Sequence, residues 1–112
     1  SSGLFTFPET GIYKIDYGTK ATSSNQQVRY LVNEIILSTD NFSSLFGGGF
    51  ASSSLSNDVS ADATGFVSCI FDVTNVSTHK AKFTVYAEHS VTWGGSSTTN
   101  VTYASFIRLG DT

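Results

Sequence analysis

The sequence predicts an all-β protein, and three observations support that fold class. Apolar and polar residues alternate with a period of two along most of the 112 residues, and no window carries the 3.6-residue spacing of an amphipathic helix. Connections rich in Gly, Asn and Ser separate the alternating runs. Because no helical crossover lies between the runs, neighbouring strands must pair antiparallel, and we expect about seven or eight short strands in a sandwich or barrel.

The first two strands are expected on either side of the only proline. Apolar alternation is carried by Phe5 and Phe7 before it and by Tyr13, Ile15 and Tyr17 after it. Pro8 has no N–H to donate to a sheet, so it fits the end of a strand. Gly11 then permits the backbone conformation that directs the chain into the second strand.

The middle of the chain holds one clear strand and one region with little pattern. Val28, Tyr30 and Val32 begin an alternating run that continues to Leu37. Residues 44–65 contain three consecutive glycines and many serines. We therefore expect only one or two short, irregular strands with long connections in this region.

Three later runs complete the predicted strands. The run 66–73 has four apolar residues on one side, namely Val67, Cys69, Phe71 and Val73. The run 79–87 likewise has Ala81, Phe83, Val85 and Ala87 on one side. In the run 100–109, one side carries Val101, Tyr103, Ser105, Ile107 and Leu109, and the other carries Thr102, Ala104, Phe106 and Arg108. Cys69 is the only cysteine, so no intrachain disulfide can form. Because Cys69 lies on the apolar side of the run 66–73, we expect it in the core.

Composition argues against two classes of partner. Only 13% of the residues are charged, the net charge is -3, and the six Lys and Arg residues are scattered singly, which leaves no basic surface for nucleic acid. No apolar run approaches the roughly 18 residues of a membrane span, so no membrane insertion is expected. The chain starts with Ser-Ser-Gly and has no methionine, and we interpret residues 1–112 as one domain from the C-terminal part of a longer chain.

The stretch FTFPETGIYKIDY, residues 5–17, resembles a segment of the tumour necrosis factor and complement globular-head superfamily. Phe5, Pro8, Gly11, Tyr13 and Tyr17 match the family pattern Phe-x-x-Pro-x-x-Gly-x-Tyr-x-Phe-x-Tyr, with Ile15 in place of its other aromatic residue. The runs QVRYLVNEIIL, AKFTVYAEH and TYASFIRLGD look like later strands of such folds, whereas residues 44–65 do not align. The resemblance implies a jelly-roll sandwich of about 8–10 strands that assembles as a homotrimer.

The number of aromatic residues fits such an assembly. The chain has nine Phe, five Tyr and one Trp, whereas a sandwich core of this size holds about eight to ten large side chains. The surplus must lie at the surface, where a contact between subunits is its expected use. We place Tyr86, Phe106 and Tyr17 at the trimer interface, the first two because each alternates out of phase with its apolar neighbours.

The residue types that perform catalysis or bind metals are sparse. His79 and His89 are the only histidines, and no nucleophile motif surrounds them, so no enzymatic activity is expected. Cys69 and the two histidines lack metal-site spacing. Asp40, Asp58 and Asp62 lie in predicted loops and are of the type that binds calcium, but loop carboxylates are more often only solvated, so we expect no cofactor and no metal ion.

One loop is the predicted ligand site. Residues 91–100, VTWGGSSTTN, hold the only tryptophan beside two glycines and several hydroxyl residues. Trp93 would stack on a sugar ring while Ser96, Thr98 and Asn100 bind its hydroxyl groups. The alternative is that Trp93 folds back over the open end of the core.

A small, disulfide-free jelly roll with few charges suggests the head of a trimeric fibre, spike or capsid protrusion of a bacterial virus. Its expected location is the virion, its partners are two further copies and a host cell-surface glycan or protein, and its role is attachment or assembly. The alternative is a secreted, extracellular complement-head-like recognition or signalling module, for which the sequons at Asn41, Asn75 and Asn100 would be relevant. A polysaccharide-cleaving enzyme would instead require a carboxylate pair in a cleft.

Overall fold

The computed structural model describes residues 4–22, 27–43, 49–59, 62–87, 92–93 and 102–112, and at 27–30, 49–59, 62 and 92–93 it describes the backbone alone. Every helix or strand assigned in these ranges is a β-strand. The strands are β1 (Phe5–Thr6), β2 (Gly11–Thr22), β3 (Gln27–Ser38), β4 (Gly49–Val59), β5 (Asp62–Val73), β6 (Lys80–Ala87), β7 (Thr92–Trp93) and β8 (Tyr103–Gly110).

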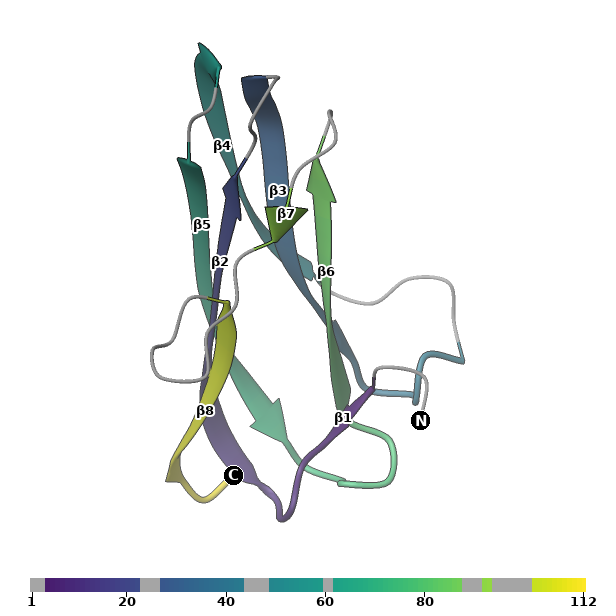
Figure 1. The fold of residues 1–112 in the computed structure, drawn as a ribbon. Helices are drawn as coiled ribbons and strands as arrows, with labels where there is room; N and C mark the ends of the chain where they lie inside the picture. Colours follow the sequence, from purple (N-terminus) through teal and green to yellow (C-terminus); the bar gives the residue numbers. More distant parts are fainter. Residues whose placement is uncertain (1–3, 23–26, 44–48, 60–61, 88–91, 94–101) are drawn as a thin grey trace.

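The strands form two antiparallel sheets that face each other (Figure 1). One sheet has the order β1-β6-β3-β4. In the other, β5 pairs with one side of β2, while β8 and β7 pair in succession along its other side. The predicted all-β, antiparallel fold is thus confirmed, and the arrangement of the two sheets is that of a β sandwich.

The proline corner carries the chain from one sheet to the other. Phe5–Thr6 pairs with β6 in the first sheet, whereas the strand that begins at Gly11 is central in the second. Pro8, Glu9 and Thr10 make the crossing. This explains why two short alternating runs stand so close together in the sequence: each belongs to a different layer.

Strand β4 corrects the prediction for residues 44–65. Gly49–Val59 is an 11-residue strand that pairs along β3, from Ile36 opposite Gly49 to Gln27 opposite Val59. The expectation of short, irregular strands was wrong because it relied on apolar alternation, which this serine-rich segment lacks. Backbone pairing with a long neighbour is sufficient to fix a strand of low intrinsic propensity.

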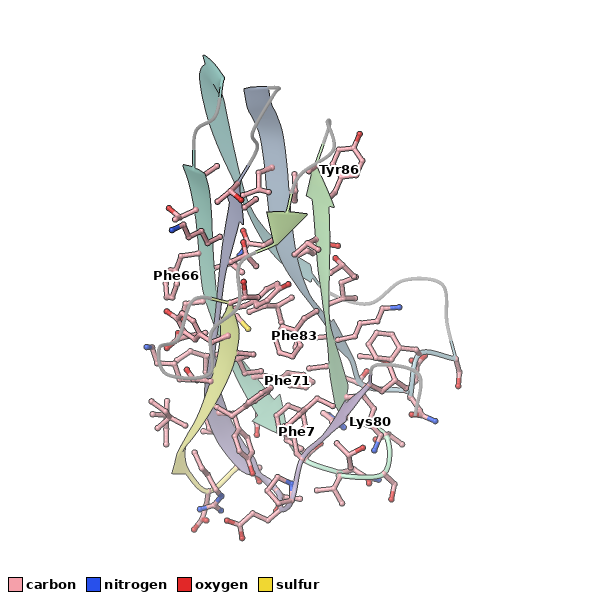
Figure 2. The ribbon with its side chains drawn as sticks, viewed as in Figure 1. Phe7, Phe66, Phe71, Lys80, Phe83 and Tyr86 are labelled. Carbon is pink, nitrogen blue, oxygen red and sulfur yellow. The ribbon has the colours of Figure 1, made fainter. Side chains whose placement is uncertain are left out.

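The core lies between the sheets and combines aromatic with aliphatic side chains. Its buried members are Phe7, Tyr13, Ile15, Tyr17, Ile35, Leu37, Val67, Cys69, Phe71, Val73 and Ala81. Phe7 contacts the rings of Tyr13 and Phe71 at centroid distances of 4.8 and 5.8 Å. Figure 2 shows Phe7, Phe71 and Phe83 between the two layers. The predicted core position of Cys69 is confirmed, with 6% of its surface exposed.

A polar group separates this core from a smaller apolar cluster of Ala21, Leu31 and Ala63. Asn33 of β3 is fully buried, and its Nδ2 donates a hydrogen bond to the Tyr17 carbonyl oxygen of the opposite sheet at 3.1 Å. A Cβ atom on Gly65 would overlap Asn33 Oδ1 and lie 3.2 Å from Thr19 Oγ1. Glycine at position 65 therefore makes room for the asparagine.

Strand β8 faces the other way from the prediction. Phe106 pairs with the buried Ile15 and stacks on Phe5, with a centroid distance of 3.8 Å and an angle of 9° between the rings. Its neighbour Ile107 is 51% exposed instead. The predicted surface position of Phe106 is wrong, because its ring packs against the core, in contact with the rings of Phe5, Phe7 and Phe83.

Candidate binding surface

The outer face of the β5-β2-β8 sheet carries most of the exposed large apolar side chains in the described residues. Lys14, Asp16 and Gly18 of β2 each lie between one residue of β5 and one of β8. The rows across the sheet are Ile70–Lys14–Ile107, Ser68–Asp16–Ser105 and Phe66–Gly18–Tyr103. Because strands rise about 3.3 Å per residue, successive rows are about 7 Å apart.

The first row is the centre of an exposed apolar patch, made of Ile70, Ile107 and Leu109. These side chains are 60%, 51% and 55% exposed. Lys14 crosses the patch, but its Nζ lies 3.1 Å from Asp16 Oδ2, which compensates its charge. The patch therefore combines apolar surface with a locally balanced charge.

The second row is polar and tightly hydrogen-bonded. Ser68 Oγ donates to Asp16 Oδ1 at 2.6 Å, and Ser105 Oγ lies 3.4 Å from Oδ2. The Asp16 side chain is only 14% exposed. The hydrogen bond from Ser68, together with that from Lys14 and its charge, holds the pKa of Asp16 below the usual 3.8, against the opposing effect of burial.

The third row borders a hollow of about 330 Å³, hereafter the Phe66 hollow. Its lining residues are Gly18, Thr19, Thr64, Gly65, Phe66 and Tyr103. The Tyr103 ring lies over Gly18, where an added Cβ would stand 2.7 Å from Tyr103 Cε1. Phe66 is 54% exposed, and Figure 2 shows it projecting from the outer side of β5.

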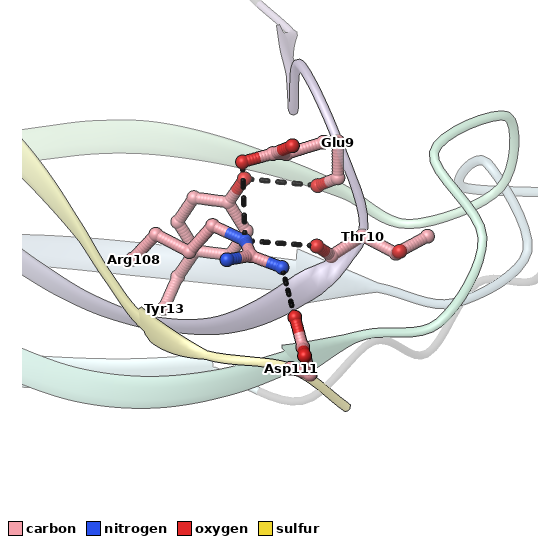
Figure 3. Close-up of polar contacts among 5 residues, drawn as sticks. All are labelled: Glu9, Thr10, Tyr13, Arg108 and Asp111. Atoms are coloured by element: carbon pink, nitrogen blue, oxygen red, sulfur yellow. Dashed lines mark hydrogen bonds and ion pairs between the residues drawn. The ribbon is translucent and has the colours of Figure 1, made fainter.

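The end of β8 is anchored to the proline corner by Arg108 (Figure 3). Its Nε lies 3.2 Å from Glu9 Oε1 and donates to the Thr10 carbonyl oxygen at 3.0 Å, and an Nη donates to Asp111 Oδ1 at 2.7 Å. The hydrogen bond to Asp111 and the charge of Glu9 raise the pKa of Arg108. Tyr13 Oη also donates to the Glu9 carbonyl oxygen at 2.9 Å, so the corner and the last strand are held together.

Comparison of the chain with protein-family models, curated proteins and solved structures gave no match. The described residues contain no helix with the length and hydropathy needed to cross a membrane.

The predicted interface residues lie in different environments. Tyr86 is 56% exposed and projects from β6 on the side of the molecule away from Phe66 (Figure 2). Tyr17 is only 7% exposed and contacts the Phe83 ring in the core, and Phe106 packs against the same core. Within one copy of the chain, Tyr86 alone of the three offers its ring to a partner.

The predicted ligand loop lies mostly outside the described residues. Ser96, Thr98 and Asn100 fall in that undescribed part of the chain. The backbone of Trp93 belongs to β7 and pairs with Ala21, so the expectation of a loop at this residue is wrong. A short pairing with the free side of β2, beyond the start of β8, accounts for the difference.

Among the possible calcium ligands and the histidines, the side chains of Asp40 and His79 lie in the described part of the chain. Of the possible calcium ligands, Asp40 accepts a hydrogen bond from Ser38 Oγ at 2.8 Å, while the side chains of Asp58 and Asp62 are not described. In the described residues no three His, Cys, Asp or Glu side chains gather in a metal-binding group. His79 is buried between the hydroxyl groups of Thr74 and Thr78 and beside the Phe71 ring.

The sequence analysis did not predict the exposed apolar residues on the outer face of the β5-β2-β8 sheet, although the pattern of one strand indicates them. The run 66–73 places Phe66 and Ile70 opposite the core positions Val67 and Cys69. Large apolar residues in both phases of one strand indicate either burial on two sides or a contact surface. Here the second face is exposed.

Proposed function

We propose that this protein is a non-enzymatic, self-assembling head domain with a jelly-roll fold, used in a virion for host attachment or assembly. Three copies form the working unit. The single observation that carries the proposal is the exposed apolar patch of Ile70, Ile107 and Leu109 on a sheet face of low net charge. Large apolar side chains exposed on one face of a sheet are typical of contact sites between proteins.

A three-fold assembly requires two different surfaces on each copy, because its contacts are heterologous. The apolar patch provides one of them. Tyr86 and its cross-strand neighbour Val32, on the outer face of the β1-β6-β3-β4 sheet, provide the second. Tyr86 therefore remains in the proposed interface. The apolar patch replaces Phe106 and Tyr17, which pack in the core.

The resemblance to the tumour necrosis factor and complement-head superfamily supports both the jelly roll and the trimer. The proline corner of that pattern connects the two sheets here, and Gly11 lies against Arg108 and Gly110 of the last strand. The placement in a bacterial virus follows from analogy with attachment heads that have few charges and no disulfide. Three linked copies would strengthen weak binding to a repetitive host surface.

The assembly is tested with Ile70→Glu and Ile107→Glu combined. Both new carboxylates flank Lys14 on the monomer, so the sheet tolerates them, whereas a buried contact between copies does not. The variant should sediment as a monomer when the unaltered chain sediments as a trimer. Ser77→Glu, in the exposed turn before β6, is the matched control and should remain trimeric. A double variant that stays trimeric would exclude the apolar patch as the interface.

The second candidate is a secreted recognition module of the complement-head type. One observation favours it: Asn75, the acceptor of the sequon Asn75-Val76-Ser77, lies exposed in the turn between β5 and β6. Expression through a eukaryotic secretory pathway, followed by treatment with peptide-N-glycosidase, tests whether this site carries a glycan. A glycosylated, trimeric product would favour the secreted module over the virion domain.

A further inference from the structure

We infer that the Phe66 hollow binds a neutral hexopyranose ring, such as a terminal sugar of a cell-surface glycan. The inference rests on the proposed attachment function and names the ligand class for it. It concerns a different site from the loop around Trp93. Three features of the described residues support it.

The first feature is the pair of aromatic side chains, Phe66 and Tyr103, that line the hollow. Phe66 and Tyr103 occupy the same row across the sheet with Gly18 between them, and the Tyr103 ring lies over Gly18, in the place that a side chain at position 18 would take. Sugar rings have apolar C–H faces, which pack against the electron-rich faces of aromatic rings. The volume of about 330 Å³ is within the range of small-ligand sites, about 300–1,000 Å³.

The second feature is the polar row next to the hollow. Ser68, Asp16 and Ser105 lie two residues further along the same face, about 7 Å away. A carboxylate has about four acceptor positions, and the neighbouring serines and Lys14 use three of those on Asp16. Hydroxyl groups at one edge of a ring stacked in the hollow can therefore donate to this row.

The third feature is the position of the hollow relative to the apolar patch. The polar row lies between them, so a sugar in the hollow and a second copy on the patch contact different rows. Thr64 is exposed, lines the hollow and pairs with Lys20, two residues beyond Gly18 on β2, so its hydroxyl group offers another polar contact. Aromatic walls with a few polar groups at the rim are the usual composition of a small-ligand site.

Saturation-transfer NMR with the methyl glycosides of glucose, galactose and mannose tests the inference on the full chain. Each is used at up to about 50 mM, because a single ring contact gives millimolar affinity. At least one glycoside should receive saturation from the protein, and Phe66→Ala should weaken its binding at least about ten-fold. Gly18→Ala, whose methyl group displaces the Tyr103 ring, should also weaken it.

Tyr86→Ala is the matched control, because this ring is equally exposed on the opposite sheet. It should leave glycoside binding unchanged while weakening the trimer, whereas Phe66→Ala should leave the trimer intact. No saturation transfer to any of the three glycosides, or binding that Phe66→Ala does not change, would overturn the inference. A trimer without sugar binding refutes only this site, and sugar binding by a monomer refutes only the assembly.

Discussion

Asn33 Oδ1 occupies the space in which a Cβ atom of Gly65 would lie. The two residues belong to opposite sheets, and Asn33 Nδ2 continues the contact by donating to the Tyr17 carbonyl oxygen. A fully buried amide is stable in a core only when its polar atoms are hydrogen-bonded. The absence of a side chain at position 65 is thus what allows one polar residue to link the two layers.

Gly65→Ala should destabilise the protein by about 1–3 kcal/mol, because the methyl group forces Asn33 out of its position. Asn33→Ala should cost about 1–3 kcal/mol through the lost hydrogen bond. The double variant should cost less than the sum of the two by about 1 kcal/mol or more, since the clash is absent. Urea unfolding at one protein concentration measures all four free energies, and strict additivity would show that the residues do not share this space.

Thr19→Val should leave stability unchanged or raise it by about 1 kcal/mol. Thr19 is 2% exposed, and its Oγ1 has no hydrogen-bond partner in the described part of the chain. Valine has nearly the same shape and removes the buried hydroxyl. Thermal unfolding followed by circular dichroism is the measurement, and a clear loss of stability would mean that the hydroxyl is hydrogen-bonded in solution.

Gly11→Ala should destabilise the proline corner by about 1–3 kcal/mol. Gly11 has a φ angle of 154°, and an added Cβ would overlap Arg108 Nε and lie 2.8 Å from the Gly110 carbonyl oxygen. Gly110→Ala is the control, because an added Cβ there meets no atom within 4 Å. Equal unfolding free energies for the two variants would contradict this account of the corner.

Asp16→Asn should make the protein less sensitive to acid. A carboxyl group whose pKa is lower in the folded than in the unfolded state adds stability above the unfolded value, near 3.8. That contribution is lost as the pH falls through the lower, folded value. The free energy of unfolding should therefore fall more steeply below pH 4 for the unaltered chain than for the variant. Parallel acid profiles would show that Ser68 and Lys14 do not stabilise the ionised form.

The fold was largely predictable, because two-residue periodicity identifies strands wherever apolar and polar residues alternate. It predicted β2, β3, β5 and β6, and it placed Cys69 in the core. It failed for β4, where serines replace the alternating pattern and pairing with β3 defines the strand. It also failed for the facing of Phe106, since an alternating run with large residues in both phases does not show which phase is buried.

The candidate site was less predictable than the fold. Phe66, Gly18 and Tyr103 come from three strands far apart in the sequence, and only the register of β2 with β5 and β8 brings them into one row. The single tryptophan predicts a site in residues 91–100, most of which lie outside the described residues, whereas Phe66 is exposed at an out-of-phase position of β5. Register, which depends on pairing across the whole sheet, is not encoded in any local motif.

Light scattering coupled to size-exclusion chromatography tests the central claim most directly, namely that the exposed apolar patch is covered by further copies of the chain. We predict a molar mass three times the 12.0 kDa of one chain, unchanged on dilution through the micromolar range. A mass of one chain at every concentration, with Ile70, Ile107 and Tyr86 left in contact with water, would contradict the account.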